Sequence, residues 1–442
     1  MRRFGVKRCW CGLLVLARAA IGEREARVDY SDGLNASTGA GRHRNPRANT
    51  NNPHQHLLLL LLLSLTACTP PTPLPHEAYI WQRQWTPAVV GAVQTQAGQF
   101  SGWRLLALQV VGERMIEVAP DLVALKATRL PLRMVVRIEG ARLRPAAGAL
   151  AMRIGELRQR WLAAGLRIDG IEIDHDCASA ALGEYAQWLR DLRAALPDTG
   201  LWSITALPAW MESPDLEALR EAVDESVLQV HAVDRPQTGL FDKTGAWYWI
   251  FDWARRSPQP FRVALPAYGV RVGVDGGGKV RAVDAEGIER VGPGGSELRA
   301  DPREVAALIE TIAEETPAGM RGWVWFRLPV AGDARGWSAP TLAAAIAGEP
   351  LQAEFSVQVT LAANGASDLV LRNDGNLDSP LPAIDLPAHC RLGDALGRYR
   401  MDDAAAGLRL VPADDAWLPA GGRLVVGWTR CAQPLEPRWS IQ

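Results

Sequence analysis

The stretch "IDGIEIDHD", residues 168–176, alternates acidic and apolar side chains along an otherwise apolar run. Successive side chains of a β-strand point to opposite faces of the sheet. A strand here therefore places Glu172, Asp174 and Asp176 on one face, and two isoleucines and a histidine on the other. We expect the isoleucines to pack under an outer layer of helices, which leaves the three carboxylates pointing inward.

Seven other stretches have the composition of strands, and amphipathic helical patterns separate them. This alternation is typical of βα units around a parallel sheet, and eight strands in a row favour a closed barrel. We therefore expect an α/β fold with a (β/α)8 TIM barrel over residues 78–349. Its other predicted strands are residues 78–85, 102–110, 130–140, 200–208, 226–234, 260–269 and 321–329.

An insertion, residues 270–300, follows the seventh predicted strand. It contains "GVDGGGKVRAVDAEG", which has the pattern of a hairpin around a triple-glycine turn. Barrel active sites are built from the loops that follow the strands, so this hairpin is a candidate lid over the site. A surface insertion without a role in the site is the alternative.

The pattern changes after residue 349 to short alternating strands with Asn, Asp, Gly and Pro between them. We expect a small all-β, sandwich-like domain over residues 350–442, which contacts carbohydrate, docks onto the barrel, or does both. Cys390 and Cys431 fall in this domain. In an exported protein they can form a disulfide, and two buried thiols are the alternative.

A run of leucines at residues 57–63 leads into Leu-Thr-Ala-Cys, which ends at Cys68. The apolar stretch is too short for a permanent membrane span and has the length of a signal-peptide core. It resembles a bacterial lipoprotein signal, which implies that residues 1–67 are a leader and that Cys68 is lipidated. The segment of residues 1–56 is too long for the start of a signal peptide, and it carries charges of both signs together with Asn and Pro. We therefore expect translation to begin further downstream. A short buried helix is the alternative.

This interpretation predicts a protein attached to the membrane through a lipid anchor in the bacterial cell envelope, on the periplasmic face of the outer membrane. Residues 68–77 are rich in proline and form an extended tether in this interpretation. The chain of 442 residues has 48 basic and 49 acidic side chains. It therefore lacks the excess of positive charge that is typical of nucleic-acid-binding proteins. No Cys/His spacing fits a zinc site. We expect a monomer without cofactor or metal.

The acidic row itself points to a chemical role. Carboxylates on one face of a strand are about 7 Å apart, and in a partly desolvated space at least one keeps its proton near neutral pH. A proton on the outermost group, Asp176, fits a general acid that protonates a glycosidic oxygen. One alternative is a structural ion network with Arg133, Arg137 and Arg327 on neighbouring strands, and another is a hard-cation site.

The row "DGIEIDHD" resembles the Asp-Gly-x-Asp-x-Asp-x-Glu signature on strand four of the family 18 glycoside hydrolases, the chitinase-like barrels. "LPAYGVR" and "GWVWF" are similar to the seventh and eighth strands of that family. Residues 78 to about 440 most resemble the bacterial family called domain of unknown function 3142, which has "WQR" in its first strand. The resemblance implies a glycoside-hydrolase-like barrel with a glycan as substrate or ligand.

The resemblance also implies roles for individual residues. Asp176 takes the place of the proton donor, Asp174 that of the group that orients a substrate acetamide, and Glu172 that of a deeper charge partner. Tyr268 is expected to hydrogen-bond the reacting sugar, and Trp325 to stack beneath it. Asp176 stands where the family has Glu, and Glu172 where it has Asp. These departures leave open a different glycosidic chemistry, or a barrel that binds sugar without cleaving it.

Three further residues are predicted to contact the ligand, namely Trp81, Arg137 and His231. Tryptophan rings stack well on sugar rings. His231 alternates with Gln229 in the sixth predicted strand and is expected to face inward, where it can orient a carboxylate. A histidine satisfied within the core is the alternative for His231.

Overall fold

The structure, a computed structural model, describes part of the chain. The described residues are 73–140, 145–231, 239–256, 259–275, 280–284, 295–361, 365–387, 389–404 and 407–432. The predicted leader, Cys68 and the tether up to residue 72 lie outside these ranges. Among the described helices, none has the length and apolar character that a membrane crossing requires.

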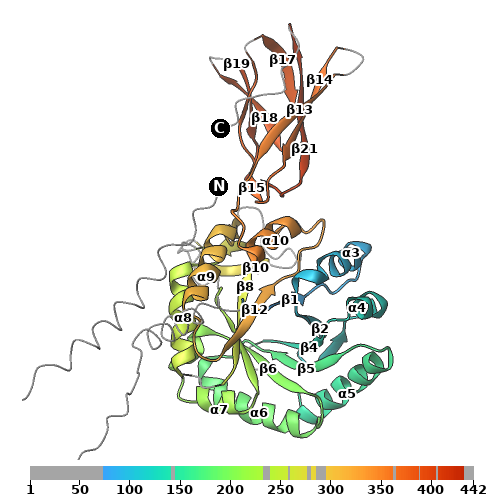
Figure 1. The fold of residues 1–442 in the computed structure, drawn as a ribbon, viewed down its shortest axis with the longest axis vertical. Coiled ribbons are helices and arrows are strands. Elements are labelled where there is room, and N and C mark those ends of the chain that lie inside the picture. The colour runs from blue at the N-terminus through green and yellow to red at the C-terminus, as the bar shows by residue number, and fades with distance from the viewer. Residues whose placement is uncertain are drawn as a thin grey trace, which may run out of the picture. The chain divides into compact units, whose positions relative to one another are not determined.

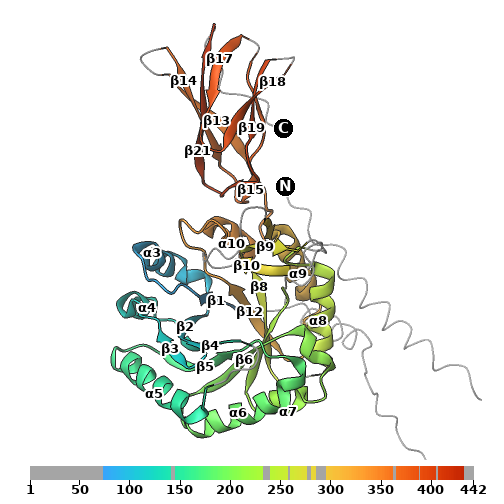
Figure 2. The ribbon, with the colours of Figure 1, turned by 180° about the vertical axis from the view of Figure 1, so that it is seen from behind.

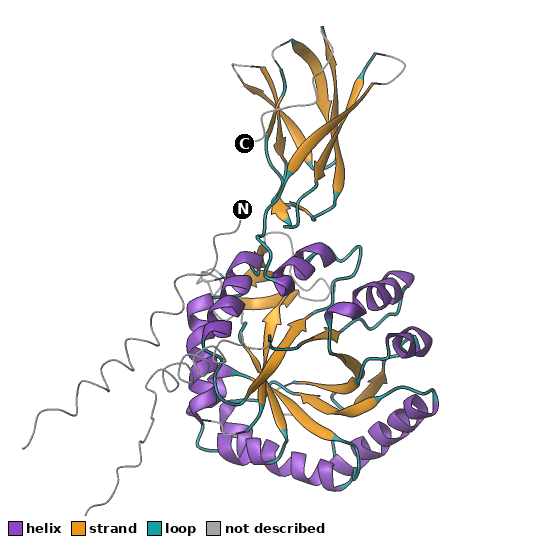
Figure 3. Ribbon diagram, viewed as in Figure 1, coloured by secondary structure: helices purple, strands orange, loops and turns teal. Residues whose placement is uncertain are grey.

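Eight parallel strands close into a barrel, and helices surround them (Figures 1 and 3). The first strand pairs with both the second and the last, so the eight parallel strands form a closed ring. A short strand, β3 (Arg114–Glu117), pairs antiparallel with the second. The expected (β/α)8 barrel is confirmed. Its strands are β1 (His76–Ile80), β2 (Gly102–Val111), β4 (Leu132–Glu139), β5 (Ile168–Asp174), β6 (Leu201–Ala206), β7 (Glu225–Gln229), β8 (Phe261–Pro266) and β12 (Met320–Phe326).

The helices begin with recognisable sequence signals. Before α9 (Pro302–Glu314), the Asp301 side chain accepts a hydrogen bond from the Arg303 backbone N–H, and Pro302 occupies the first helical position. Short 3-10 turns η1 (Ala97–Gln99), η2 (Ser179–Ala181) and η3 (Pro208–Glu212) join other elements. The described helices are α3 (Pro87–Gln96), α4 (Leu122–Thr128), α5 (Ala147–Ala163), α6 (Leu182–Ala194), α7 (Leu216–Glu221), α8 (Lys243–Arg256), α9 (Pro302–Glu314) and α10 (Ala339–Ala347).

Two separate apolar layers result from the alternation of side chains along the strands. Ile171 and Ile173 of β5 belong to the large core between strands and helices, as the sequence predicted. A smaller cluster fills the middle of the barrel and includes Leu106, Val135 and Val324. The acidic face of β5 therefore points into the barrel, because the opposite face is buried under the helices.

The insertion after β8 forms a small sheet of three antiparallel strands in the order β10-β9-β11. The strands are β9 (Gly269–Val274), β10 (Val280–Asp284) and β11 (Ser296–Arg299). The predicted hairpin is thus extended by a third strand, which pairs with the free edge of β9. Residues 276–279, the triple-glycine turn among them, lie outside the described residues, and the role of the insertion as a lid stays a prediction.

The C-terminal part is all-β, as expected, and its antiparallel strands are visible from behind in Figure 2. Its apolar core includes Leu369, Ile384, Leu410 and Val426. One sheet contains β13 (Phe355–Leu361), β14 (Ser367–Asn373), β21 (Arg423–Cys431) and β17 (Cys390–Ala395). A second contains β16 (Ile384–Asp385), β19 (Gly407–Pro412) and β18 (Tyr399–Ala404), and β15 (Ser379–Pro380) pairs with β20 (Trp417–Leu418).

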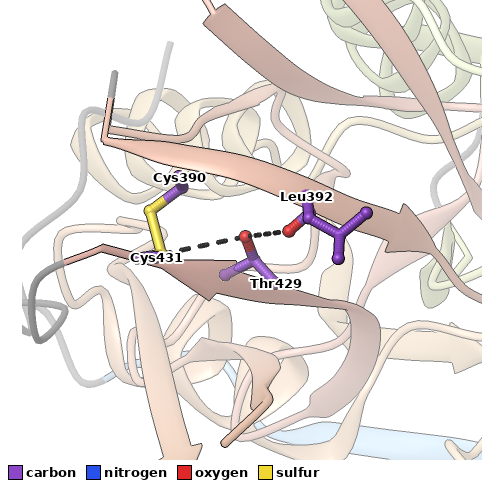
Figure 4. The surroundings of a disulfide bond; sticks show 4 residues. All are labelled: Cys390, Leu392, Thr429 and Cys431. Atoms are coloured by element: carbon purple, nitrogen blue, oxygen red, sulfur yellow. Dashed lines mark hydrogen bonds between the residues drawn. A yellow bond between two sulfur atoms is a disulfide. The ribbon is translucent and has the colours of Figure 1, made fainter.

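A disulfide joins Cys390 at the start of β17 to Cys431 at the end of β21 (Figure 4). The two residues are also register partners in the sheet. Next to them, the Thr429 hydroxyl donates a hydrogen bond to the backbone oxygen of Leu392 (2.9 Å). Of the two alternatives that the sequence left open for this pair, the structure has the disulfide.

Candidate active site

A cavity of about 150 Å³ lies at the carboxyl ends of the barrel strands. This is the end at which TIM barrels hold their ligands. Three of its lining residues are charged, and the remainder are mainly aromatic or neutral polar. The lining residues are Tyr79, Trp81, Arg137, Asp174, Asp176, Thr205, Gln229, His231, Ala264, Tyr268 and Phe326.

One wall of the cavity carries the two outer acids of the row. Arg137 on β4 places its Nη1 atom 2.8 Å from Asp174 Oδ2 and 2.9 Å from Asp176 Oδ2, so one nitrogen contacts both carboxylates. The Thr205 hydroxyl on β6 donates a hydrogen bond of 2.7 Å to the other oxygen of Asp174. The Asp174 side chain is 5% exposed and that of Asp176 is 42% exposed. The pair therefore extends from the closed interior to the mouth.

Burial raises the pKa of Asp174 to about 6. Arg137 and the hydrogen bond from Thr205 oppose this rise in pKa, and the negative charge of Asp176 adds to it. The sequence predicted that the outermost carboxyl, Asp176, retains a proton. In the structure the barrel removes Asp174 from water and so raises the pKa of this carboxyl, and a proton on Asp176 stays a prediction.

The opposite wall is aromatic, with Phe326 at its centre. The ring centroid of Phe326 lies 5.1 Å from those of Trp81 and Tyr268, and 5.8 Å from that of Tyr79. The His231 ring stacks on Phe326 at 6.1 Å. The cavity thus has one acidic and one aromatic side, an arrangement in which a ring with polar substituents can contact both.

His231 follows β7 and bridges the polar and aromatic sides of the cavity. Burial lowers its pKa to about 4, although the charge of Asp176 acts in the opposite direction, so the imidazole is neutral at neutral pH. Its Nδ1 atom lies at hydrogen-bonding distance, 3.3 Å, from the Tyr268 hydroxyl. The Nε2 atom is buried and has no hydrogen-bond partner among the described residues. It is available to a ligand hydroxyl.

Glu172, the third acid of the row, lies deeper and does not line the cavity. The Tyr79 hydroxyl donates a hydrogen bond of 2.5 Å to Glu172 Oε1, and the Ser203 hydroxyl donates one of 3.1 Å to Oε2. Arg104 on β2 forms an ion pair with the same carboxylate, and both side chains are fully buried. Glu172 is therefore held as a charge partner inside the barrel.

Arg104 is the centre of a buried ion network toward the amino ends of the strands. It also binds Glu77 on β1 (2.7 Å) and Glu225 on β7 (2.8 Å). Arg133 contacts Glu225 at 2.8 Å, and Arg262 on β8 contacts Glu225 at 3.0 Å and Glu77 at 3.2 Å. Three glutamates and three arginines thus neutralise one another.

This network corrects part of the expected ion pairing. In the alternative of a structural ion network, Arg133, Arg137 and Arg327 are the partners of the acidic row, and of these Arg137 contacts its two outer acids. Arg133 pairs with Glu225 and, at 3.3 Å, with Asp169, and Arg327 pairs with Asp333 at 2.6 Å. The observed ion pairs differ from the expected ones because the strand register around the barrel decides which side chains meet. The spacing of residues in the sequence does not give this register.

Trp325, predicted to stack beneath a sugar, does not line the cavity. It is fully buried in the core between strands and helices, where its indole N–H donates a hydrogen bond to His76 Nδ1 (3.0 Å). On β12 the residues that face the interior are Val324 and Phe326, since side chains alternate. The expectation that Trp325 contacts the ligand was wrong, and the next residue, Phe326, provides the aromatic surface of the cavity.

The other predicted contact residues, Trp81, Arg137, His231 and Tyr268, all line the cavity, and their roles toward a ligand stay predictions. Sequence reasoning missed Thr205 and Tyr79. Each lies on the inward face of its strand, two positions from another inward polar residue. A search for polar residues at period two on every strand, and not only on β5, would have found them.

Residues 128–331 match the family model described as "Domain of unknown function (DUF3142)", and residues 356–432 match "Domain of unknown function (DUF8456)". No curated protein matches the chain. Among solved structures, the spore cortex-lytic enzyme SleL of Bacillus cereus is 13% identical, with 62% of this chain and 74% of that chain covered and a TM-score of 0.44.

Two chitinases from Chromobacterium violaceum are also similar. One is 14% identical over 62% of this chain and 98% of that chain, with a TM-score of 0.42. The other, of family GH18, is 10% identical over 80% of this chain and 88% of that chain, with a TM-score of 0.41. We do not assign roles to residues of this chain from these similarities. Residues 128–331, which match the family model described as domain of unknown function 3142, lie within the closed barrel that the strand sequences predicted.

Proposed function

We propose that the barrel hydrolyses a glycan, with the Asp174–Asp176 pair as its acid. The observation that supports this function best is the position of the pair. Two carboxylates share one guanidinium nitrogen at the mouth of a cavity whose opposite wall is aromatic. Hydrolysis of a glycosidic bond needs a carboxyl group that is still protonated near the working pH.

In this mechanism Asp176, half exposed at the mouth, donates the proton to the leaving oxygen as the glycosidic bond breaks, and a water molecule adds to the anomeric carbon and returns a proton to the Asp174–Asp176 pair. Asp174, with a pKa of about 6, shares that proton with its neighbour, so the two groups titrate as a pair. Arg137 fixes the orientation of both carboxylates. The aromatic wall around Phe326 positions the sugar ring, and the Nε2 atom of His231 binds one of its hydroxyls.

The test is hydrolysis of a panel of β-linked oligosaccharides by the wild type, Asp176→Asn and Asp174→Asn. Both variants should lose about a hundredfold or more in kcat/KM, and wild-type activity should fall above pH 6, as the pair loses its proton. Asp169→Asn is the matched control, because Asp169 lies on the same strand at the far end from the cavity. Equal turnover by the wild type and Asp176→Asn would exclude Asp176 as the donor.

A barrel that binds a glycan without cleaving it is the second candidate. The observation that favours it is the pairing of both carboxylates with Arg137, since a neighbouring cation stabilises the ionised carboxylate, which has no proton to donate to a ligand oxygen. Binding of an oligosaccharide without turnover over the whole pH range from 4 to 8 would select this candidate.

We place the protein, as a proposal, in the bacterial cell envelope, held by a lipid on Cys68. The support is the leucine-rich segment that ends in Leu-Thr-Ala-Cys, together with a disulfide in the C-terminal domain, which is typical of exported proteins. Expression with a radiolabelled fatty acid should label the wild type and not Cys68→Ser. Mature protein that retains residues 1–67 would contradict this location.

A further inference from the structure

We propose that the end of the barrel at which its strands begin contacts an anionic phospholipid surface through a basic hollow beside α4 and α5. The choice of a membrane as the partner rests on the proposed location in the cell envelope, and the hydrolysis of a glycan plays no part in it. A lipid on Cys68 supplies only an anchor, whereas this inference names the face of the protein that meets the membrane.

The basic hollow lies where α4 and α5 end and the chain continues into β4 and β5. Its volume is about 250 Å³. Its rim has three exposed cations, Lys126, Arg129 and Arg167, and no acid is among the described residues that line it. Its floor is formed by buried apolar side chains, namely Trp103, Leu125, Leu132 and Leu166.

The three cations of the rim differ from other exposed arginines in having no acid opposite them. Arg255 and Arg398 each contact a carboxylate oxygen at 2.9 Å. Within the described part of the chain, no ion pair joins Lys126, Arg129 or Arg167 to an acid. Their positive charge is therefore available to a partner.

The ends of the two helices do not account for this group of charges. A cation in the last turn of a helix interacts favourably with the helix dipole, which explains Lys126 in α4. Arg167 lies between α5 and β5, and its Nη1 atom donates a hydrogen bond to the backbone oxygen of Arg129 (3.0 Å). The acid nearest to it along the chain, Asp169, contacts Arg133 instead (3.3 Å). The bond thus holds two like charges beside one hollow, an arrangement that an anion stabilises.

Cations above an apolar floor suit a ligand that is both anionic and apolar. Arginine and lysine bind phosphate oxygens through charge-assisted hydrogen bonds. The apolar floor gains free energy when it covers the apolar part of the same molecule. A phospholipid has both parts, whereas inorganic phosphate has only the first.

Strand register connects the hollow to the start of β1. Ile168, which follows Arg167, is the register partner of Leu132. Leu132 in turn pairs with Trp103, and Trp103 pairs with Ala78 of β1. Neighbouring strands are about 4.8 Å apart, so these three steps place Arg167 within about 15 Å of the start of β1.

The predicted anchor joins the barrel at this same end, because the chain enters β1 at His76. Residues 68–75 span about 25 Å at most, even when fully extended. With a lipid on Cys68, the membrane therefore lies within that distance of the start of β1. The end of the barrel that carries the basic hollow then faces the anionic headgroups, to which each exposed Lys or Arg is attracted.

The experiment is co-sedimentation of the full mature chain with vesicles, in the Cys68→Ser background. This background has no site for a lipid anchor, so the protein binds only through its surface. Vesicles of phosphatidylglycerol and phosphatidylcholine in equal amounts should bind it at about 0.05 M salt, and about 0.5 M salt should release it. Vesicles of phosphatidylcholine alone should bind it about a hundredfold more weakly.

Variants of the rim test the role of its three cations. Lys126→Gln, Arg129→Gln and Arg167→Gln should each weaken binding to the anionic vesicles about fivefold, and the triple variant about a hundredfold. The melting temperature, followed by circular dichroism, shows whether each variant is folded.

The matched control removes three exposed arginines that pair with acids elsewhere, by Arg255→Gln, Arg372→Gln and Arg398→Gln together. It loses the same net charge as the triple variant of the rim. Its affinity for the anionic vesicles should stay within about threefold of that of the parent chain, because the removed charges lie outside the proposed contact.

Equal binding by the two triple variants would overturn the inference. Binding of inorganic phosphate or polyglutamate, measured by calorimetry, without sedimentation on vesicles would also overturn it, since the hollow would then bind a soluble anion. Neither result bears on the proposed hydrolysis, which is measured with soluble oligosaccharides. Labelling of Cys68 with a fatty acid tests the proposed location separately.

Discussion

The two polar layers inside the barrel are built from the same kinds of side chain, but their charges are balanced differently. Toward the amino ends of the strands, three buried glutamates meet three arginines, with Arg104 in contact with all three glutamates, and the partly exposed Asp169 also contacts Arg133. At the carboxyl ends, Asp174 and Asp176 share a single arginine. Asp174 and Asp176 line the cavity, and none of the three glutamates of the lower layer does. Charge balance, and not the presence of buried acids, distinguishes a structural layer from a candidate site.

The two layers also affect stability in opposite directions as the pH changes. Burial alone would raise the pKa of Glu225, but Arg104, Arg262 and Arg133 outweigh burial and lower the pKa from 4.5 to about 2. This group therefore stabilises the fold above pH 4.5, and the stabilisation is lost as the pH falls through 2. The pKa of Asp174 is raised from 3.8 to about 6, so its contribution is present below pH 3.8 and is lost as the pH rises through 6.

Removal of the arginine at the centre of the balanced layer should have the largest effect. Arg104→Met leaves Glu77, Glu172 and Glu225 without a shared partner in a dry interior. We expect a loss of roughly 4 kcal/mol in the free energy of unfolding, or a failure to accumulate folded protein. Urea denaturation followed by tryptophan fluorescence measures the loss.

Arg255→Met is the matched control for this variant. Arg255 forms an ion pair with Asp252 on the surface of α8, and its side chain is 74% exposed. The expected change in the free energy of unfolding is within about 0.5 kcal/mol. If Arg104→Met were as mild as this control, the lower layer would not be a structural network.

A second variant tests the sign of the pH dependence in the lower layer. Glu225→Gln removes the carboxylate that contacts three arginines and should cost about 3 kcal/mol at pH 6. The difference between the two proteins in the free energy of unfolding should shrink by about 2 kcal/mol from pH 6 to pH 3. The reason is that the wild-type Glu225 carboxylate stabilises the fold less as it becomes protonated. A difference that does not depend on pH would contradict the lowered pKa of Glu225.

The third variant tests the upper layer and should give the smallest change, with the opposite sign. Asp174→Asn removes a carboxylate that burial makes costly to ionise. Between pH 4 and pH 7.5 its free energy of unfolding should improve relative to the wild type by about 2 kcal/mol. Denaturation curves at the two pH values provide the measurement. If the variant instead became relatively less stable at pH 7.5, Arg137 would compensate Asp174 fully, and the comparison of the two layers would fail.

The barrel itself was predictable from the sequence, and the reason is local. Strand and helix patterns depend on residues that are close together in the sequence, and they repeat along this chain. Each of the eight predicted strands overlaps a strand of the structure. On β5 the choice of the inward face was correct, because two isoleucines have no other place than the core under the helices. On β12 the same reasoning failed for Trp325, since both faces of "WVWF" are apolar and nothing local distinguishes them.

By itself, the sequence determined the closed barrel, the all-β C-terminal domain and the inward direction of the acidic row, because these follow from side-chain period and burial. The tertiary structure alone decided which cation meets which acid. Arg104 lies 68 positions before Glu172 in the chain, and Arg137 lies 37 before Asp174. Both pairings depend on strand register around the barrel and on depth below its mouth. Depth also decided the burial of Asp174, which raises the pKa of this carboxyl.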